Sequence, residues 1–296
     1  MANTNTNCLA LRSAGELLLA GQTGRVVAIR GDSAEVIANI DGTPVAFGAS
    51  PRFPGVVFVG LAEGLGIVRL PARGDPAGKP QYDRPAAYAE LGDGYPGILS
   101  DGNGDLWLTT YVTGIWHLRF RSSDPLDVEI THYTKADGLP DDSNLGVSFL
   151  DGRVLIAHEK GLLEAVPQLP GVSGKSLRFV PEATFGKLLN DEQKAVYEVR
   201  RDSLGCVWVD TKTGVGIVRF GSDGGCRLDR TLGKELPAGA HGLFPDRGGV
   251  VWIGGADELF RFDPGMTKTY GQDFSTLISL VKTPTGPALF NGFLYA

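Results

Sequence analysis

A short pattern recurs along the chain: a glycine, any residue, and then three mostly apolar residues. Clear copies are Gly104-Asp-Leu-Trp-Leu108 and Gly205-Cys-Val-Trp-Val209. The glycines of the copies stand at positions 15, 55, 104, 152, 205, 249 and 286, about 45 residues apart on average, which is close to the length of one four-stranded propeller blade. One small sheet cannot bury both of its faces alone. The period therefore predicts sheets that stack on one another and shield their apolar faces mutually.

A second apolar element follows most copies of the first, as in Gly66-Ile-Val-Arg-Leu70 and Gly216-Ile-Val-Arg-Phe220. Each pair is typical of two antiparallel strands joined by a glycine-containing turn. An apolar stretch such as 145–150 precedes the pair and predicts an innermost strand. A stretch of alternating polarity such as 128–134 follows it and predicts an outer strand with one wet face.

We therefore predict an all-β chain: one seven-bladed β-propeller of four-stranded antiparallel blades over residues 1–296, with an incomplete last blade. The last blade ends after its third strand, so the chain is expected to be a fragment of a longer protein. The second strands should lie between blades, so we expect Trp107, Trp208 and Trp252 to be buried there. The blade cores are expected near residues 15–29, 55–70, 104–120, 152–166, 205–220, 249–262 and 286–295.

The charge balance limits the classes of partner. A net charge of −6 argues against nucleic acid, whose phosphates require clustered Lys and Arg, and against an anionic membrane surface. No apolar run approaches the roughly 20 residues that span a bilayer, so no membrane insertion is predicted. Residues 1–7 have neither a basic start nor an apolar core of a signal peptide. This predicts a cytoplasmic protein, or a periplasmic one whose signal has been removed.

Three stretches resemble the two-component-regulator propeller repeat. Its characteristic run is Asp, a turn, Gly, an apolar residue, Trp and an apolar residue, followed by a turn and a Gly–apolar–Arg–aromatic close. The run appears in Asp202–Thr211, closing at Gly216–Phe220, and in Asp246–Gly254. A further copy begins at Asp101, and the stretch Tyr133–Pro140 resembles the family's link between blades.

The resemblance implies a role in signalling. Propellers of this family commonly form the periplasmic sensing part of bacterial hybrid sensor kinases or of diguanylate cyclases. They bind ligands, often glycan fragments, and pass the signal through a membrane helix. This chain has no kinase or cyclase motif, so signalling domains outside it, or a homodimer, are expected as partners. The family has no universal binding residues, and none is transferred.

We therefore predict a ligand-sensing module without cofactor or catalytic residues, which binds a small polar ligand such as a carbohydrate. In propellers the turn between the second and third strands opens on the same face as the links between blades. A mixture of aromatic, carboxylate and amine groups there would suit a sugar. The predicted ligand-binding residues are Glu63, Tyr111, His158, Glu159, Lys160, Lys212 and Asp257 in these turns, and Tyr95 in a link.

The sequence predicts no metal centre. The loop Asp101–Asp105 begins like an EF-hand loop but lacks the distal Glu, so we interpret it as a hairpin turn. We expect Asp151, Asp202 and Asp246 to bond their own backbone in turns. None of the four histidines (His117, His132, His158 and His241) pairs with another at metal-ligand spacing.

Two other functions remain open from the sequence. One is an enzyme resembling streptogramin lyase, with His158 and Glu159 as acid–base groups that converge in a turn. The other is a protein-docking scaffold, which would carry an exposed apolar patch on an outer strand or on the broad face.

Overall fold

The structure is a computed structural model in which nearly all regular secondary structure is β-strand. It describes residues 6–11, 18–22, 24–30, 33–71, 79–92, 94, 97–185, 188–189, 195–222, 224–231, 236, 241–245, 249–254, 259–262, 288–290 and 293–295. Within these ranges, two short 3-10 helices accompany the strands, Ala86–Tyr88 and Lys135–Asp137. No helix of this part of the chain has the length and apolar character needed to cross a bilayer. The predicted all-β class is confirmed.

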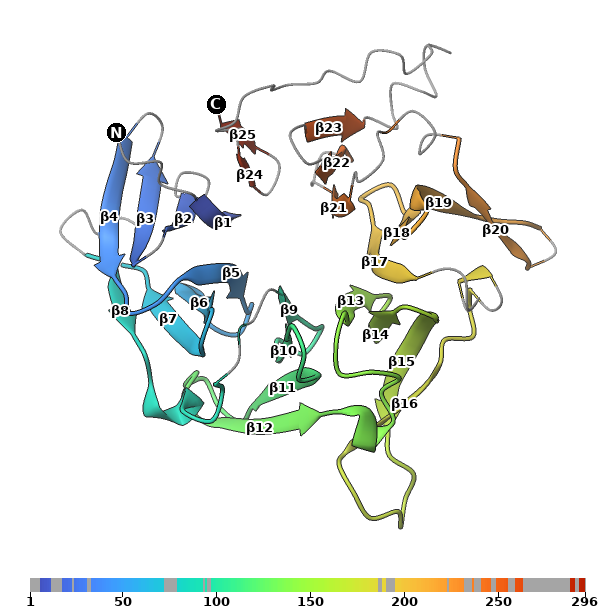
Figure 1. The fold of residues 1–296 in the computed structure, drawn as a ribbon, viewed down its shortest axis with the longest axis horizontal. Helices are drawn as coiled ribbons and strands as arrows, with labels where there is room; N and C mark the ends of the chain where they lie inside the picture. The colour runs from blue at the N-terminus through green and yellow to red at the C-terminus, as the bar shows by residue number, and fades with distance from the viewer. Residues whose placement is uncertain are drawn as a thin grey trace. The chain divides into compact units, whose positions relative to one another are not determined.

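The chain divides into two compact units, and the first contains three four-stranded antiparallel sheets. It comprises Met1–Val147 together with Gln168–Ser176. In each sheet the strands lie side by side in chain order (Figure 1). The strands are β1 (Thr6–Leu11), β2 (Leu18–Gln22), β3 (Arg25–Arg30) and β4 (Ser33–Asn39); β5 (Pro44–Ala49), β6 (Val56–Leu61), β7 (Leu65–Arg69) and β8 (Gln81–Asp83); and β9 (Gly97–Ser100), β10 (Leu106–Thr109), β11 (Ile115–Phe120) and β12 (Val128–Tyr133).

The second unit comprises Ser148–Pro167 and Leu177–Ala296, so the division falls within β13 (Gly146–Leu150). Its described sheets have four, four, three and two strands. The first two contain β13, β14 (Arg153–His158), β15 (Gly161–Pro167) and β16 (Leu177–Pro181), and then β17 (Val196–Arg201), β18 (Val207–Thr211), β19 (Gly214–Phe220) and β20 (Cys226–Asp229). The others contain β21 (His241–Pro245), β22 (Val251–Gly254) and β23 (Leu259–Phe262), and β24 (Ala288–Phe290) and β25 (Phe293–Tyr295).

The predicted number of blades is wrong. A blade is here a four-stranded antiparallel sheet, and the described residues form five of them rather than seven. The sixth and seventh repeats form a three-stranded sheet and a two-stranded hairpin in the part of the chain that is described. The error has a simple source: the repeated glycine pattern marks the hairpin of the middle strands, and a blade also needs strands on both sides of it. The assignment of residues 1–296 to a single propeller stays a prediction.

Mutual shielding of the sheets is visible inside the first unit. Along β6, successive side chains point to opposite faces of the sheet, as in any strand. Val57 and Val59 belong to the core cluster that contains Val26 of β3. Phe58, between them, belongs to the cluster that contains Leu106 of β10. Both faces of the middle strand are therefore buried, each against a neighbouring blade.

The second unit repeats this arrangement at β18. Val207 and Val209 lie in the same apolar cluster as Leu155 of β14. Trp208 lies on the other side, in the cluster that contains Val251 and neighbouring residues of β22 and β23. Trp107, Trp208 and Trp252 are all buried, as predicted.

In two of the hairpin turns, an aspartate carboxylate accepts the same three hydrogen bonds. Oδ1 of Asp202 accepts the backbone N–H groups of Leu204 and Cys206, at 3.0 and 2.8 Å, and Oδ2 accepts the indole N–H of Trp208 at 2.8 Å. The predicted role of Asp202 in its own turn is therefore confirmed. Asp101 makes the equivalent three bonds in its blade.

Asp151 departs from this prediction, while Asp246 lies outside the described residues. Asp151 and Gly152 have φ angles of 53° and 79°, as in the mirror-image turn that suits a two-residue hairpin. The carboxylate of Asp151 pairs with Arg201 at 2.5 Å instead of with its own turn.

Candidate functional site

The turns between the second and third strands are held by one repeat position. Thr110 and Thr211 occupy it in two blades, and His158 occupies it in a third. Oγ1 of Thr110 donates to the carbonyl of Gly114 at 2.9 Å, and Oγ1 of Thr211 donates to that of Gly214 at 2.8 Å. In the Thr110 turn the hydroxyl adds to a backbone bond, because the N–H of Thr110 also donates to the carbonyl of Gly114, at 3.2 Å.

His158 also caps its turn, but through a ring nitrogen that accepts a hydrogen bond. Its side chain is buried, and Nδ1 accepts the backbone N–H of Lys160 at 3.1 Å. The neutral ring consequently carries its proton on Nε2. Burial lowers the pKa of His158, and the nearby charge of Lys160 lowers it further. The structure therefore places this predicted ligand-binding residue in a turn cap.

A side chain near the end of the outer strand braces several of these turns. Arg84, just after β8, donates to the carbonyl of Glu63, and His132 of β12 contacts the carbonyl of Thr113. Arg230, just after β20, donates to Oγ1 of Thr211 at 3.2 Å. In the turns of Thr110 and Thr211, this side chain adds to the threonine cap.

In the first unit, the predicted residue Tyr111 lies near the turn that carries another predicted residue, Glu63. The Tyr111 side chain, 57% exposed, follows β10, and Glu63 is exposed in the turn after β6. Gly94 lies close to both segments: a Cβ placed there would be 2.9 Å from the carbonyl oxygen of Ala62 and 3.1 Å from Cε2 of Tyr111. We call the group of Ala62, Glu63, Gly94, Tyr111 and the 68% exposed Val112 the Tyr111 surface.

Among the residues that the structure describes, the other predicted side chains are not brought together in this way. Glu159 and Lys160 are exposed in the turn after β14. Lys212 is exposed after β18, and its backbone N–H donates to the carbonyl of Ala195 at 2.9 Å. Asp257 and Tyr95 lie outside the described residues.

The acid–base pair of the lyase interpretation is not formed in this structure. The His158 ring is buried, whereas the adjacent Glu159 is exposed. No hydrogen bond joins the two side chains in the described part of the chain. Sequence adjacency alone therefore does not make them converge.

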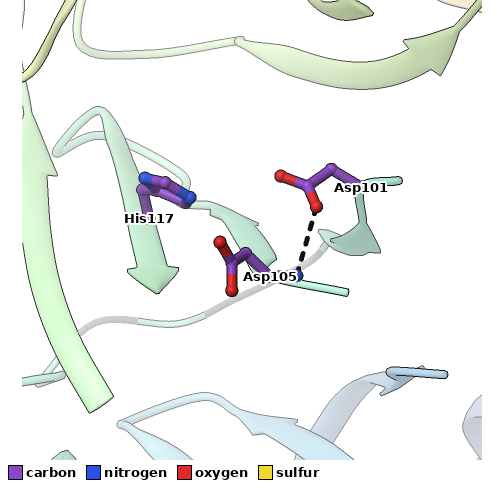
Figure 2. A group of neighbouring side chains, drawn as sticks. All are labelled: Asp101, Asp105 and His117. Carbon is purple, nitrogen blue, oxygen red and sulfur yellow. Dashed lines mark hydrogen bonds between the residues drawn. The ribbon is translucent and has the colours of Figure 1, made fainter. Parts of the chain in front are cut away.

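A second group of side chains lies in the third blade. Asp101 and Asp105 come from the β9–β10 hairpin and His117 from β11, and one ligand-type atom of each lies within 4.8 Å of the others (Figure 2). The Asp101 carboxylate accepts N–H bonds from Asn103 and Asp105 through Oδ1, and from the Trp107 indole through Oδ2. It is a turn cap, as the sequence predicted.

Asp105 is buried, and Oδ1 accepts the backbone N–H of Phe120 at 3.0 Å. The same oxygen lies 3.4 Å from a guanidinium nitrogen of Arg52. The described residues provide no hydrogen bond to Oδ2 of Asp105.

The His117 ring is stacked on Trp107, with the ring centroids 4.2 Å apart and the planes at 17°. Its Nε2 is buried and has no hydrogen-bond partner among the described residues. Burial lowers the pKa of His117, although Asp105 and Asp101 act in the opposite direction. The ring is therefore neutral near pH 7, with a lone pair on one nitrogen.

Sequence reasoning missed this group because it searched for histidines close together in the sequence. The ligand types here meet across strands: Trp107 pairs with His117 in the register of β10 and β11, and Asp105 precedes Trp107 by two residues on the same face. Aligning the two strands of the hairpin repeat would have placed Trp107 opposite His117, with Asp105 two residues before Trp107.

No protein-family model matches the chain, and no curated protein matches it either. Solved structures do resemble it. A streptogramin B lyase has a TM-score of 0.56 at 16% identity, covering 90% of this chain and 82% of the lyase. The β-propeller domain of Cps50 (Swd1) from Myceliophteria thermophila has a TM-score of 0.53 at 11% identity, covering 89% and 86%. These likenesses show the propeller fold alone.

The extracellular domain of the hybrid two component system BT4673 from B. thetaiotaomicron is a more distant neighbour. Its TM-score is 0.45 at 15% identity, and the match covers 89% of this chain but 44% of that one. A likeness this low carries no argument about function. Neighbours of the fold thus range from an enzyme to a domain of a signalling protein.

Proposed function

We propose that this chain is a ligand-binding module whose Tyr111 surface binds a small polar ligand such as a carbohydrate. The observation that carries the proposal is the exposed Tyr111 ring, which lies against Gly94 together with the carbonyl of Ala62, the residue before the exposed Glu63. An aromatic face packs on the apolar face of a sugar, while a neighbouring carboxylate accepts hydrogen bonds from its hydroxyls.

Hydrogen bonds within the chain hold the two turns that carry this surface. Thr110 donates to Gly114 and accepts the backbone N–H of Thr113 at 2.9 Å, so the turn that carries Tyr111 is closed internally. Arg84 holds the turn that carries Glu63. A preformed surface loses less conformational entropy on binding than a loose one.

The proposal also includes a sensory role and a periplasmic location. They are supported by the resemblance of Asp202–Thr211 and Asp246–Gly254 to the two-component-regulator propeller repeat. In this proposal the chain is the input domain of a bacterial signalling protein, and the output domains lie outside it.

Thermal unfolding against a panel of oligosaccharides tests the binding role. A ligand at 100 times its dissociation constant should stabilise the chain by about 2.7 kcal/mol. Tyr111→Ala should abolish the shift, and Tyr111→Phe should keep it because the ring face remains. Tyr197→Ala removes another exposed tyrosine, in the other unit, and serves as the control. A panel that shifts neither wild type nor Tyr111→Phe would refute the proposal, and so would a shift that Tyr111→Ala leaves intact.

A further inference from the structure

We propose that Asp101, Asp105 and His117 bind one divalent transition-metal ion of the Zn²⁺, Co²⁺ and Ni²⁺ type. The site lies at the hairpin of the third blade and is independent of the Tyr111 surface. It would consist of one imidazole nitrogen and two carboxylate oxygens, with further coordination positions left for water.

The spacing of the ligand atoms fits a single ion after a small closure. The three atoms lie within 4.8 Å of one another. Ligands of one zinc ion at about 2.0–2.2 Å from the metal stand roughly 3.5 Å apart. Side-chain rotations that move the ligand atoms by about one ångström would therefore bring them to metal-binding distance. In Figure 2 a nitrogen of the His117 ring faces the two carboxyl groups.

The hydrogen bonds already present leave lone pairs for a metal. Oδ2 of Asp101 accepts one bond, from the Trp107 indole, and a carboxylate oxygen can accept a second interaction. Oδ2 of Asp105 accepts none from the described residues. Nε2 of His117 is buried and has no hydrogen-bond partner in the described part of the chain. A buried polar atom without a partner is energetically unfavourable, and a bound ion would remove this cost.

Other blades have different residues at the positions of Asp105 and His117. In the fifth blade Asp202 makes the same turn cap as Asp101, but Cys206 and Ile217 stand where the third blade has Asp105 and His117. The turn thus requires neither an acid nor an imidazole at these positions.

The fourth blade contains a complementary pair there. Arg153 and Glu164 occupy the two positions and form an ion pair at 3.2 Å. No hydrogen bond joins Asp105 to His117 in the described part of the third blade. A cation between them would supply the link that the fourth blade makes directly.

The donor set determines the class of metal. Calcium and magnesium prefer oxygen ligands alone, whereas imidazole nitrogen favours zinc, cobalt and nickel. Arg52 lies 3.4 Å from Oδ1 of Asp105 and offsets part of the negative charge, which further disfavours ions that depend on charge alone.

Titration of the metal-free full chain with Co²⁺, followed by visible absorption and by equilibrium dialysis, tests the site. We expect one equivalent to bind and thermal stability to rise, with Zn²⁺ displacing Co²⁺. His117→Ile installs the residue of the fifth blade, so the fold should be kept while affinity falls. Asp105→Asn keeps one oxygen for the Phe120 N–H and removes the charge. Because loss of a residue that merely supports a ligand costs roughly 10–100-fold in affinity, loss of a ligand should cost at least about tenfold.

His158→Thr removes a histidine of the other unit and should bind Co²⁺ like wild type. Circular dichroism and urea unfolding establish that His117→Ile is folded. Absence of Co²⁺ and Zn²⁺ binding to wild type would overturn the proposal. Binding that folded His117→Ile and Asp105→Asn both retain would place the ion elsewhere and overturn it as well. Neither result would bear on carbohydrate binding at Tyr111.

Discussion

The carboxylate of Asp210 accepts the backbone N–H of Gly242 at 2.9 Å and so ties β18 to the first strand of the next sheet. Glu198, which pairs with Asp210 across β17 and β18, accepts the N–H of the following residue, Leu243, also at 2.9 Å. The register of β21 shifts between His241 and Leu243. Such an irregularity leaves N–H groups outside the ladder, and here two adjacent acids satisfy them.

Replacing Asp210 by Ala removes the acceptor of the Gly242 N–H and should lower the free energy of unfolding by about 1–3 kcal/mol, as for hydrogen bonds to charged groups. Asp210→Asn keeps a carbonyl oxygen at the same place and should cost less. Urea unfolding of wild type and both variants measures the difference. Equal losses for Ala and Asn would contradict a hydrogen-bonding role.

Gly114 and Gly138 offer a matched pair, since both have left-handed backbone angles, with φ of 95° and 100°. A Cβ on Gly114 would lie 2.2 Å from the carbonyl oxygen of Tyr133, whereas a Cβ on Gly138 would meet nothing within 4 Å. Gly138→Ala should cost about 1–2 kcal/mol for the conformation alone. Gly114→Ala should cost clearly more, because the Tyr133 backbone must also move. Denaturant midpoints compare the two, and an equal loss would show that the close approach is unimportant.

Much of the fold could be predicted from the sequence because the hairpin pattern is local. The glycine spacing located the middle strands, and Trp107 and Trp208 are buried as expected. The blade number could not be derived in the same way. The outer and inner strands have weaker patterns, and the hairpin motif was counted as a blade even at Gly286, where only β24 and β25 are described.

The candidate site was less predictable because side-chain roles depend on register. His158 looked like an exposed polar residue, although its place in the repeat is that of Thr110 and Thr211, which cap their turns. Conversely, His117 looked isolated because its neighbours Asp101 and Asp105 lie on other strands or turns. Aligning the blades with one another supplies the assignment of His158, and aligning the two strands of one hairpin supplies that of His117.

Asp202 should contribute more to the free energy of unfolding than the other acidic residues in turns. Asp202→Ala leaves the Trp208 indole N–H and two backbone N–H groups without their acceptor, and should cost about 3 kcal/mol. Asp151→Asn is the control, since it removes an exposed ion pair with Arg201, worth about 0–1 kcal/mol, and Asn tolerates a positive φ. Urea unfolding followed by tryptophan fluorescence reports both. A loss for Asp202→Ala no larger than that for the control would show that the buried bonds contribute little.

His158 should make the stability of the fold depend on pH. Burial, the larger cause, and the charge of Lys160, the smaller one, lower the pKa of His158 in the folded protein below the ordinary value of 6.5. Above that value the ring is neutral in both states and pH has no effect. As pH falls below it, the unfolded chain takes up the proton more readily, so the free energy of unfolding decreases until pH passes the lower, folded-state pKa.

His158→Thr installs the residue that caps the equivalent turns and cannot titrate. Urea unfolding of both proteins at about pH 7.5 and about pH 5.5 isolates the effect, because the other histidines contribute equally to each. The stability of the variant relative to wild type should rise at the lower pH, and a constant difference would show that His158 keeps an ordinary pKa in the folded protein.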